Sequence, residues 1–175
     1  MMKPSSPERE RAIEAIRVLN NFVGDITTAT KTWEHAPTIA KNPKLVPMLN
    51  RMCITYLILS LAKLMEFYDR YNRILPRQDG VELKAVRSEL GARGLLDLRN
   101  KVIGHIWDKE RNRPLTDSEV DTQLAKITKG NPDEFIAWIN GDTPETEPKC
   151  VVNLIERTRN LLIAQHSATD EELFI

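Results

Sequence analysis

The arrangement of the chain is best understood from Leu95-Leu96-Asp97-Leu98-Arg99-Asn100-Lys101-Val102-Ile103-Gly104-His105-Ile106-Trp107-Asp108. At about 100° per residue, the apolar side chains of an α-helix with this sequence share one broad face. That face consists of Leu95, Leu96, Leu98, Val102, Ile103, Ile106 and Trp107. The remaining sector is filled by Asp97, Asn100, Lys101 and Gly104. The spacing therefore predicts a helix over 95–107 around which the rest of the chain packs.

Two residues of this predicted helix are chemically out of place. Arg99 falls in the middle of the apolar face, and His105 lies at its edge. Because a guanidinium keeps its charge, it needs an anionic partner, a wet cleft or a ligand in such a place. Gly104 costs a helix interior about 1 kcal/mol relative to alanine, and it leaves room for close approach beside the histidine. These residues form the strongest candidate for a site of chemistry.

The pattern Arg99-Asn100, four further residues and His105 resembles the R-N-x4-H form of the Arg-x4-6-His motif of HEPN domains. Those domains are small helical bundles, and many are metal-independent ribonucleases of toxin and phage-defence systems. The segment 98–105 is similar to the abortive-infection-like branch, although this match covers only about eight residues. The resemblance implies RNA as the substrate, an antitoxin protein as a partner, and a site at the two-fold interface of a homodimer.

The same resemblance implies a role for each motif residue. His105 would move a proton between a ribose 2′-hydroxyl and the leaving 5′-oxygen, and Arg99 would stabilise charge on the phosphate. Asn100 would orient the phosphate or hold the His105 loop of the second chain. One departure concerns Trp107, which stands where a subclass regulated by nucleotide transfer has a tyrosine. That form of regulation is not expected here.

A second stretch fits the same motif. Arg159-Asn160 is followed after five more residues by His166, so six residues separate the arginine from the histidine. We prefer Arg99 and His105, because their flanks fit the family and they do not lie beside the chain end. For either pair, the alternative is an arginine in a structural ion pair and a histidine whose hydrogen bonds are satisfied.

Composition indicates one soluble helical domain. The chain has 175 residues, 41% of them hydrophobic, and its 7 glycines and 6% aromatic content favour helices over sheets. The net charge is +0, which argues against nucleic-acid affinity over the whole surface. However, residues 69–113 carry eleven Lys and Arg against seven Asp and Glu, and residues 114–149 carry three against eight. The basic part contains the motif and suits a phosphate-bearing substrate, although a solvated charged face explains it equally well.

Apolar spacing and capping residues predict an all-α, up-down helical bundle of HEPN type with additional C-terminal helices. We expect a single domain over 1–175, with a core of about 6–108 plus 149–167 and an acidic, insertion-like segment at 114–148. The predicted helices span about 6–36, 43–72, 81–93, 95–107, 119–129, 131–139 and 149–167. Residues 75–80 are expected to form a turn, and residues 169–175 a short tail.

The end of the second predicted helix offers weaker candidates for substrate binding. Tyr68 and Tyr71 stand beside Arg70, and tyrosines next to basic groups can stack a base and contact phosphate. Lys101, within the motif helix, is a further candidate. The alternative is that the tyrosines pack in the core with their hydroxyl groups at its rim.

Several other chemistries find no support in the sequence. It contains neither a G-x-G-x-x-G run nor a P-loop, and it lacks the paired Glu-x-x-His motifs of a di-iron bundle. His105 and Asp108 have the spacing to share a metal ion, but two ligands are too few for a site. Glu66 and Asp69 are better explained by a solvated helix face than by a catalytic dyad. We therefore expect no metal and no cofactor.

The cysteines and the apolar runs bear on location. Cys53 and Cys150 are far apart, and Cys53 lies in an apolar run, which favours a buried thiol in a reducing cytosol. The charged N-terminus does not have the pattern of a signal peptide. The apolar run 52–65 is interrupted by polar residues and is too short to cross a bilayer. The expected protein is cytoplasmic with no membrane partner, and the 52–65 run is expected to supply part of a dimer interface.

Two further functions compete with a ribonuclease. One is a non-catalytic helical module that docks a partner protein or a nucleotide, and the other is a small nucleic-acid-binding regulator. The second would require basic residues to gather on one face beyond the motif. For the first, the discriminating feature is whether Arg99 and His105 lie open in a cleft or are sealed into intramolecular pairs.

Overall fold

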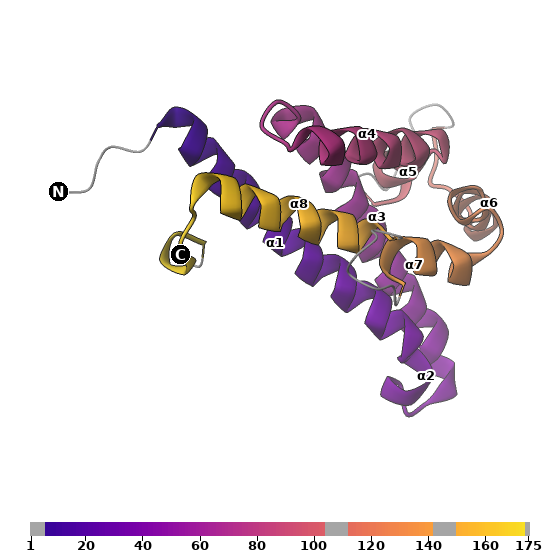
Figure 1. Ribbon diagram of the computed structural model, residues 1–175. Helices are drawn as coiled ribbons and strands as arrows, with labels where there is room; N and C mark the ends of the chain where they lie inside the picture. The colour runs from indigo at the N-terminus through magenta and orange to yellow at the C-terminus, as the bar shows by residue number, and fades with distance from the viewer. Residues whose placement is uncertain (1–5, 104–111, 142–149, 174–175) are drawn as a thin grey trace.

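The computed structural model describes residues 6–103, 112–141 and 150–173. In these ranges the regular structure is helical, with no β-strand (Figure 1). The predicted all-α helical bundle is therefore confirmed.

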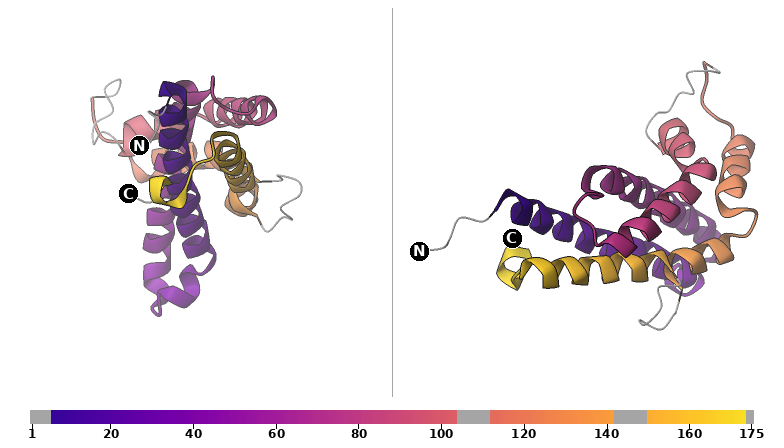
Figure 2. Two further views of the ribbon diagram at one scale, coloured as in Figure 1. Left: turned by 60° about the vertical axis from the view of Figure 1, so that its left-hand side comes forward. Right: turned by 45° about the horizontal axis from the view of Figure 1, so that its top comes forward.

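The two long helices α1 (Pro7–Glu34) and α3 (Val46–Tyr71) pack against each other in opposite directions. α1 begins as expected, because the hydroxyl of Ser6 accepts a hydrogen bond from the backbone N–H of Arg9. The connection consists of the short α2 (Ala36–Ile39) and the 3-10 turn η1 (Pro43–Leu45). Figure 2 (left) shows that this end of the α1–α3 hairpin extends past the other helices.

The core lies where α1 packs against α3 on one side and α8 (Val151–His166) on the other. Each of these helices contributes side chains with no exposed surface, among them Leu19, Leu61 and Ile155. Both cysteines are buried free thiols, as expected for Cys53. Burial raises the pKa of the Cys53 thiol, which keeps it protonated.

The helix α4 (Arg77–Ala92) starts earlier than the sequence indicated, because part of the expected 75–80 turn is helical. Proline, aspartate and glycine are turn formers, but here Asp79 is a buried residue of the first helical turn. Its Oδ1 accepts hydrogen bonds from Nε and Nη2 of Arg157 on α8, at 3.1 and 2.8 Å. This contact between helices favours the helical start over the local preference for a turn.

The segment expected to be an insertion is part of the bundle. It contains α6 (Asp117–Thr128) and α7 (Pro132–Asn140), and Thr116 and Glu119 form the predicted capping box at the start of α6. Ile127, Phe135 and Ile139 are buried in the common core. The segment was expected to be an insertion because of its acidic composition. The acidic side chains lie on the outer faces of the same two helices that bury these apolar residues.

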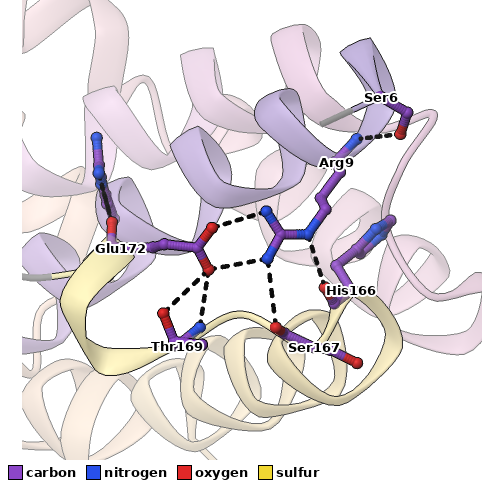
Figure 3. A network of polar contacts seen from close by, with 7 residues as sticks. Ser6, Arg9, His166, Ser167, Thr169 and Glu172 are labelled. Carbon is purple, nitrogen blue, oxygen red and sulfur yellow. Dashed lines mark hydrogen bonds and ion pairs between the residues drawn. The ribbon is translucent and has the colours of Figure 1, made fainter. Parts of the chain in front are cut away.

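The tail also folds, as α9 (Asp170–Leu173), and returns to the start of α1 (Figure 3). Arg9 holds Glu172 through Nη1 and Nη2 at 2.7 and 2.8 Å, and its Nε donates to the carbonyl oxygen of His166 at 3.1 Å. The hydrogen bond from Arg9, with those from Thr169, lowers the pKa of Glu172 to about 2. The side chain of Leu173 is buried beneath this contact.

The segment Pro43–Tyr71 is long and apolar enough to cross a membrane by length and composition, with a mean hydropathy of 1.5 in its most apolar window. The apolar run 52–65, which was expected to be too short to cross a bilayer, is therefore part of a longer segment that has the required length and composition. The C-terminal part of α3 packs in the bundle core, whereas Met48 and Met52 are 63% and 68% exposed. This pattern is consistent with a soluble bundle in which the N-terminal part of α3 presents an uncovered apolar face.

Candidate anion site beside the α1–α3 groove

The predicted 95–107 helix is divided in the structure. Gly94, with φ of 77°, turns the chain out of α4 into the single turn α5 (Leu95–Leu98). The chain then continues as a π-helical turn, η2 (Arg99–Ile103), which includes Arg99 and Asn100 of the motif. Because a π turn holds more residues than an α turn, the 100° spacing used to assign faces fails from Arg99 onward. Residues 104–108, including His105, lie outside the described residues.

Arg99 has the anionic partner that its position demanded. Its Nη2 donates to Oε1 of Glu66, which projects from α3. The side chain of Arg99 is 31% exposed and that of Glu66 is 61% exposed, so the pair lies at the edge of the core. The Nε of Arg99 is buried and has no hydrogen-bond acceptor among the described residues. The guanidinium is thus only partly satisfied.

Glu66 and Asp69 belong to separate ion pairs. Asp69 accepts from Nε and Nη2 of Arg87 on α4, at 2.7 and 2.8 Å, while Glu66 binds Arg99. Each carboxylate is therefore neutralised by its own arginine. This arrangement is that of two interhelical ion pairs and not of a catalytic dyad.

A groove of about 590 Å³ runs between α1 and α3 and reaches the Arg99 pair through Glu66. Its basic side chains are Lys63 and Arg70, and its acidic ones are Glu14, Asp25 and Glu66. Arg70 binds Glu14 across the groove at 3.1 Å, whereas Lys63 has no ion-pair partner in the described part of the chain. The groove is therefore mixed in charge, and Lys63 lies on α3 one turn before Glu66, the partner of Arg99.

Tyr71 lines this groove but is not placed to stack a base. Its side chain is buried, with its ring 4.8 Å from that of Phe67 and the guanidinium of Arg70 5.5 Å from the ring centre. Burial and a hydrogen bond to Glu14 raise the pKa of Tyr71 to about 12. Tyr68 is half-buried against the core. Tyr71 fits the alternative of core packing, and its burial does not agree with the stacking role predicted for it. For the half-buried Tyr68, that role stays a prediction.

The remaining candidates sit together on η2. Asn100 is exposed next to Arg99, and Lys101 is half-buried and has a partner. The structure thus gathers Arg99, Asn100 and Lys101 on one turn, with Arg70 in the adjoining groove. Among the residues that the structure describes, no three His, Cys, Asp or Glu side chains are grouped to hold a metal ion.

The second motif occupies a different helix, α8. Arg159 donates to the side-chain oxygens of Asn20 and Asn160, at 3.2 and 3.0 Å, and lines a pocket of about 360 Å³ with Asn153 and Arg157. His166 ends α8, and its carbonyl oxygen binds Arg9 in the contact that holds α9 (Figure 3). Arg159 is therefore held by amides where Arg99 is held by a carboxylate.

Sequence reasoning missed Glu66 as the partner of Arg99. The two residues are far apart in the chain, and no spacing rule connects them. The available signal was that a buried guanidinium needs an anion, and Glu66 was one of many candidates.

Comparison with known proteins shows the fold and does not identify a family. No family model and no curated protein matches the chain. A solved structure described as an integron cassette protein from the mobile metagenome of V. paracholerae is similar, with a TM-score of 0.70 and 22% sequence identity. The match covers 93% of this chain and 99% of that chain, so the two proteins share essentially the whole helical architecture.

Proposed function

We propose that this protein is a metal-independent RNA endonuclease of the toxin or phage-defence type, acting in the cytoplasm. The observation that supports this most is the state of Arg99. It is a partly exposed guanidinium on a π turn, and its Nε has no acceptor within the described ranges. It lies beside a groove that is lined by Lys63. Such a guanidinium suits a phosphodiester, because charge-assisted hydrogen bonds from arginine stabilise charge developing on phosphate.

The proposed chemistry divides between Arg99 and the remaining motif residues. His105 takes the proton from the 2′-hydroxyl, and that oxygen attacks the adjacent phosphorus. The bond from phosphorus to the 5′-oxygen then breaks as His105 returns the proton to the leaving 5′-oxygen. The products are a 2′,3′-cyclic phosphate and a free 5′-hydroxyl. Asn100, exposed beside Arg99, orients the phosphate. The resemblance of 98–105 to HEPN domains supports this assignment.

The site is proposed to be completed by a second copy of the chain, with an antitoxin protein as a further partner. Support comes from α3, where Met48 is exposed and where the exposed Met52 and Tyr56 line an apolar groove of about 350 Å³. Met52 and Glu66 are fourteen residues apart, close to four helical turns, so they share one face of α3. A chain that covers Met52 would therefore lie on the same face of α3 as the Arg99–Glu66 pair.

The test is cleavage of single-stranded RNA by the purified protein in excess EDTA. We expect cleavage to persist, with 2′,3′-cyclic phosphate ends on the products. A matched substrate with 2′-deoxyribose at the cleaved position should bind with similar affinity and remain intact, since phosphate contacts dominate binding. Loss of cleavage on addition of EDTA, or cleavage of the deoxy substrate, would contradict this mechanism.

The second candidate function is a non-catalytic binding module for a partner protein or a nucleotide. It is favoured by the ion pair between Arg99 and Glu66, because an arginine that is paired with a carboxylate of its own chain contributes to the fold. Wild-type protein that cleaves no RNA, with or without divalent metal, would establish this alternative over the ribonuclease.

A further inference from the structure

The ion pair of Arg99 is incomplete in a specific way. The Nε and Nη2 of an arginine form one edge of the guanidinium, which can bind both oxygens of a carboxylate or phosphate. At Arg99, Glu66 accepts from Nη2 alone, while the buried Nε on the same edge has no acceptor among the described residues. One half of a two-point anion site is thus occupied and the other half is empty.

Arg87 provides an internal comparison on the same side of α3. Its Nε and Nη2 donate to the two oxygens of Asp69, at 2.7 and 2.8 Å, so the whole edge is used. The exposures are similar, at 38% and 55% for Arg87 and Asp69 against 31% and 61% for Arg99 and Glu66. Solvent exposure therefore does not explain why the Arg87–Asp69 pair is bidentate and the Arg99–Glu66 pair is not.

The carboxylate of Glu66 is suited to exchange its ion pair with Arg99 for solvent. Its side chain is 61% exposed, and Arg99 is its only hydrogen-bond or ion-pair partner among the described residues. It projects from α3 into the α1–α3 groove. Lys63, one turn earlier on the same helix, also lines this groove and has no ion-pair partner among the residues that the structure describes. An anion that displaced Glu66 from Arg99 would reach the groove that Lys63 lines, and the released carboxylate would turn towards water.

We propose that Glu66 is a resident competitor of the substrate phosphate. Without ligand it holds the Nη2 of Arg99. An entering phosphodiester displaces it, takes Nη2, and takes Nε as well once the departure of Glu66 uncovers that atom. This inference rests on the proposed function for its choice of anion, a nucleic-acid phosphodiester. The carboxylate thereby weakens binding of phosphates that contact Arg99 alone and favours a strand long enough to engage the groove as well.

The experiment measures binding of a fluorescent single-stranded DNA 12-mer to the full chain by anisotropy, at fixed ionic strength. The DNA lacks the 2′-hydroxyl, so binding is separated from cleavage. Glu66→Gln should tighten binding roughly threefold to fivefold, the range expected on removing a partly exposed ion-pair competitor. Asp69→Asn is the matched control, since it removes the same charge one turn away on α3, and it should change binding by less than half as much.

The decisive comparison introduces Glu66→Gln into a protein that already carries Arg99→Ala. If Glu66 acts through Arg99, Glu66→Gln should give no gain in a chain that already carries Arg99→Ala. Four results would each overturn the proposal. Asp69→Asn gives an equal gain, the gain from Glu66→Gln persists without Arg99, Glu66→Gln leaves binding unchanged or weaker, or no variant binds the DNA. Cleavage of RNA is measured separately. If the protein binds DNA through Arg99 but cleaves no RNA, the proposed ribonuclease function is wrong. If it cleaves RNA but Glu66→Gln does not change DNA binding, the proposed competitor role of Glu66 is wrong.

Discussion

Individual side chains of this bundle divide into those that hold the fold and those that are only partly engaged. Arg9, Arg87 and Arg157 each use Nε and at least one terminal nitrogen in contacts between helices. Among the described residues, Arg99 donates from Nη2 to Glu66, and its buried Nε has no acceptor. An orphaned buried donor costs about 1–3 kcal/mol, and under the proposed function a phosphate oxygen would be its acceptor.

Stability at the residue scale should depend on burial and not on the motif. Leu61 has no exposed surface, so Leu61→Ala should lower the free energy of unfolding by about 2–5 kcal/mol through lost contacts and the cavity left behind. Urea denaturation followed by circular dichroism measures this. Leu161→Ala on α8, where the leucine is 41% exposed, is the control and should cost much less. Equal losses for the two variants would show that the core is placed wrongly.

At the scale of elements, the pairing of α9 with α1 makes stability depend on pH. The folded pKa of Glu172 is about 2, below the value of about 4.3 of an unfolded glutamate, so its contribution is present above pH 4.3. That contribution is lost as the pH falls from about 4 towards 2. We therefore expect Arg9→Met to lower the urea midpoint relative to wild type at pH 6, with a smaller difference at pH 3. A difference that is the same at both pH values would contradict the assigned role of this ion pair.

The elements also show what the sequence could predict. The positions of α1, α3, α6, α7 and α8 followed from apolar spacing and from caps such as Thr116 with Glu119, because these signals are local. The early start of α4 and the folding of α9 depend on Arg157 and Arg9, which lie far away in the chain. The π turn at Arg99 breaks α-helical spacing, and Glu66 reaches it from another helix. Neither feature leaves a periodic signal.

At the scale of the whole molecule, the uncovered face of α3 predicts self-association. Met52 is 68% exposed in the middle of a helix face that also carries Met48 and Tyr56. We expect light scattering at micromolar concentration to give the mass of a dimer, and Met52→Glu to shift it to a monomer, because a buried charge opposes association. Lys84→Glu, at an exposed position of α4, is the control. A wild-type monomer would contradict the shared site.

The central claim is that Arg99 and His105 cleave RNA, and the rate of cleavage by four single variants tests it most directly. Arg99→Ala and His105→Ala should each reduce the rate by about 10²-fold or more while the helical content is unchanged. Arg159→Ala and His166→Ala, which remove the second motif, should leave it nearly at the wild-type value. If the second pair abolishes cleavage and the first does not, the site lies on α8 and the account given for Arg99 is wrong.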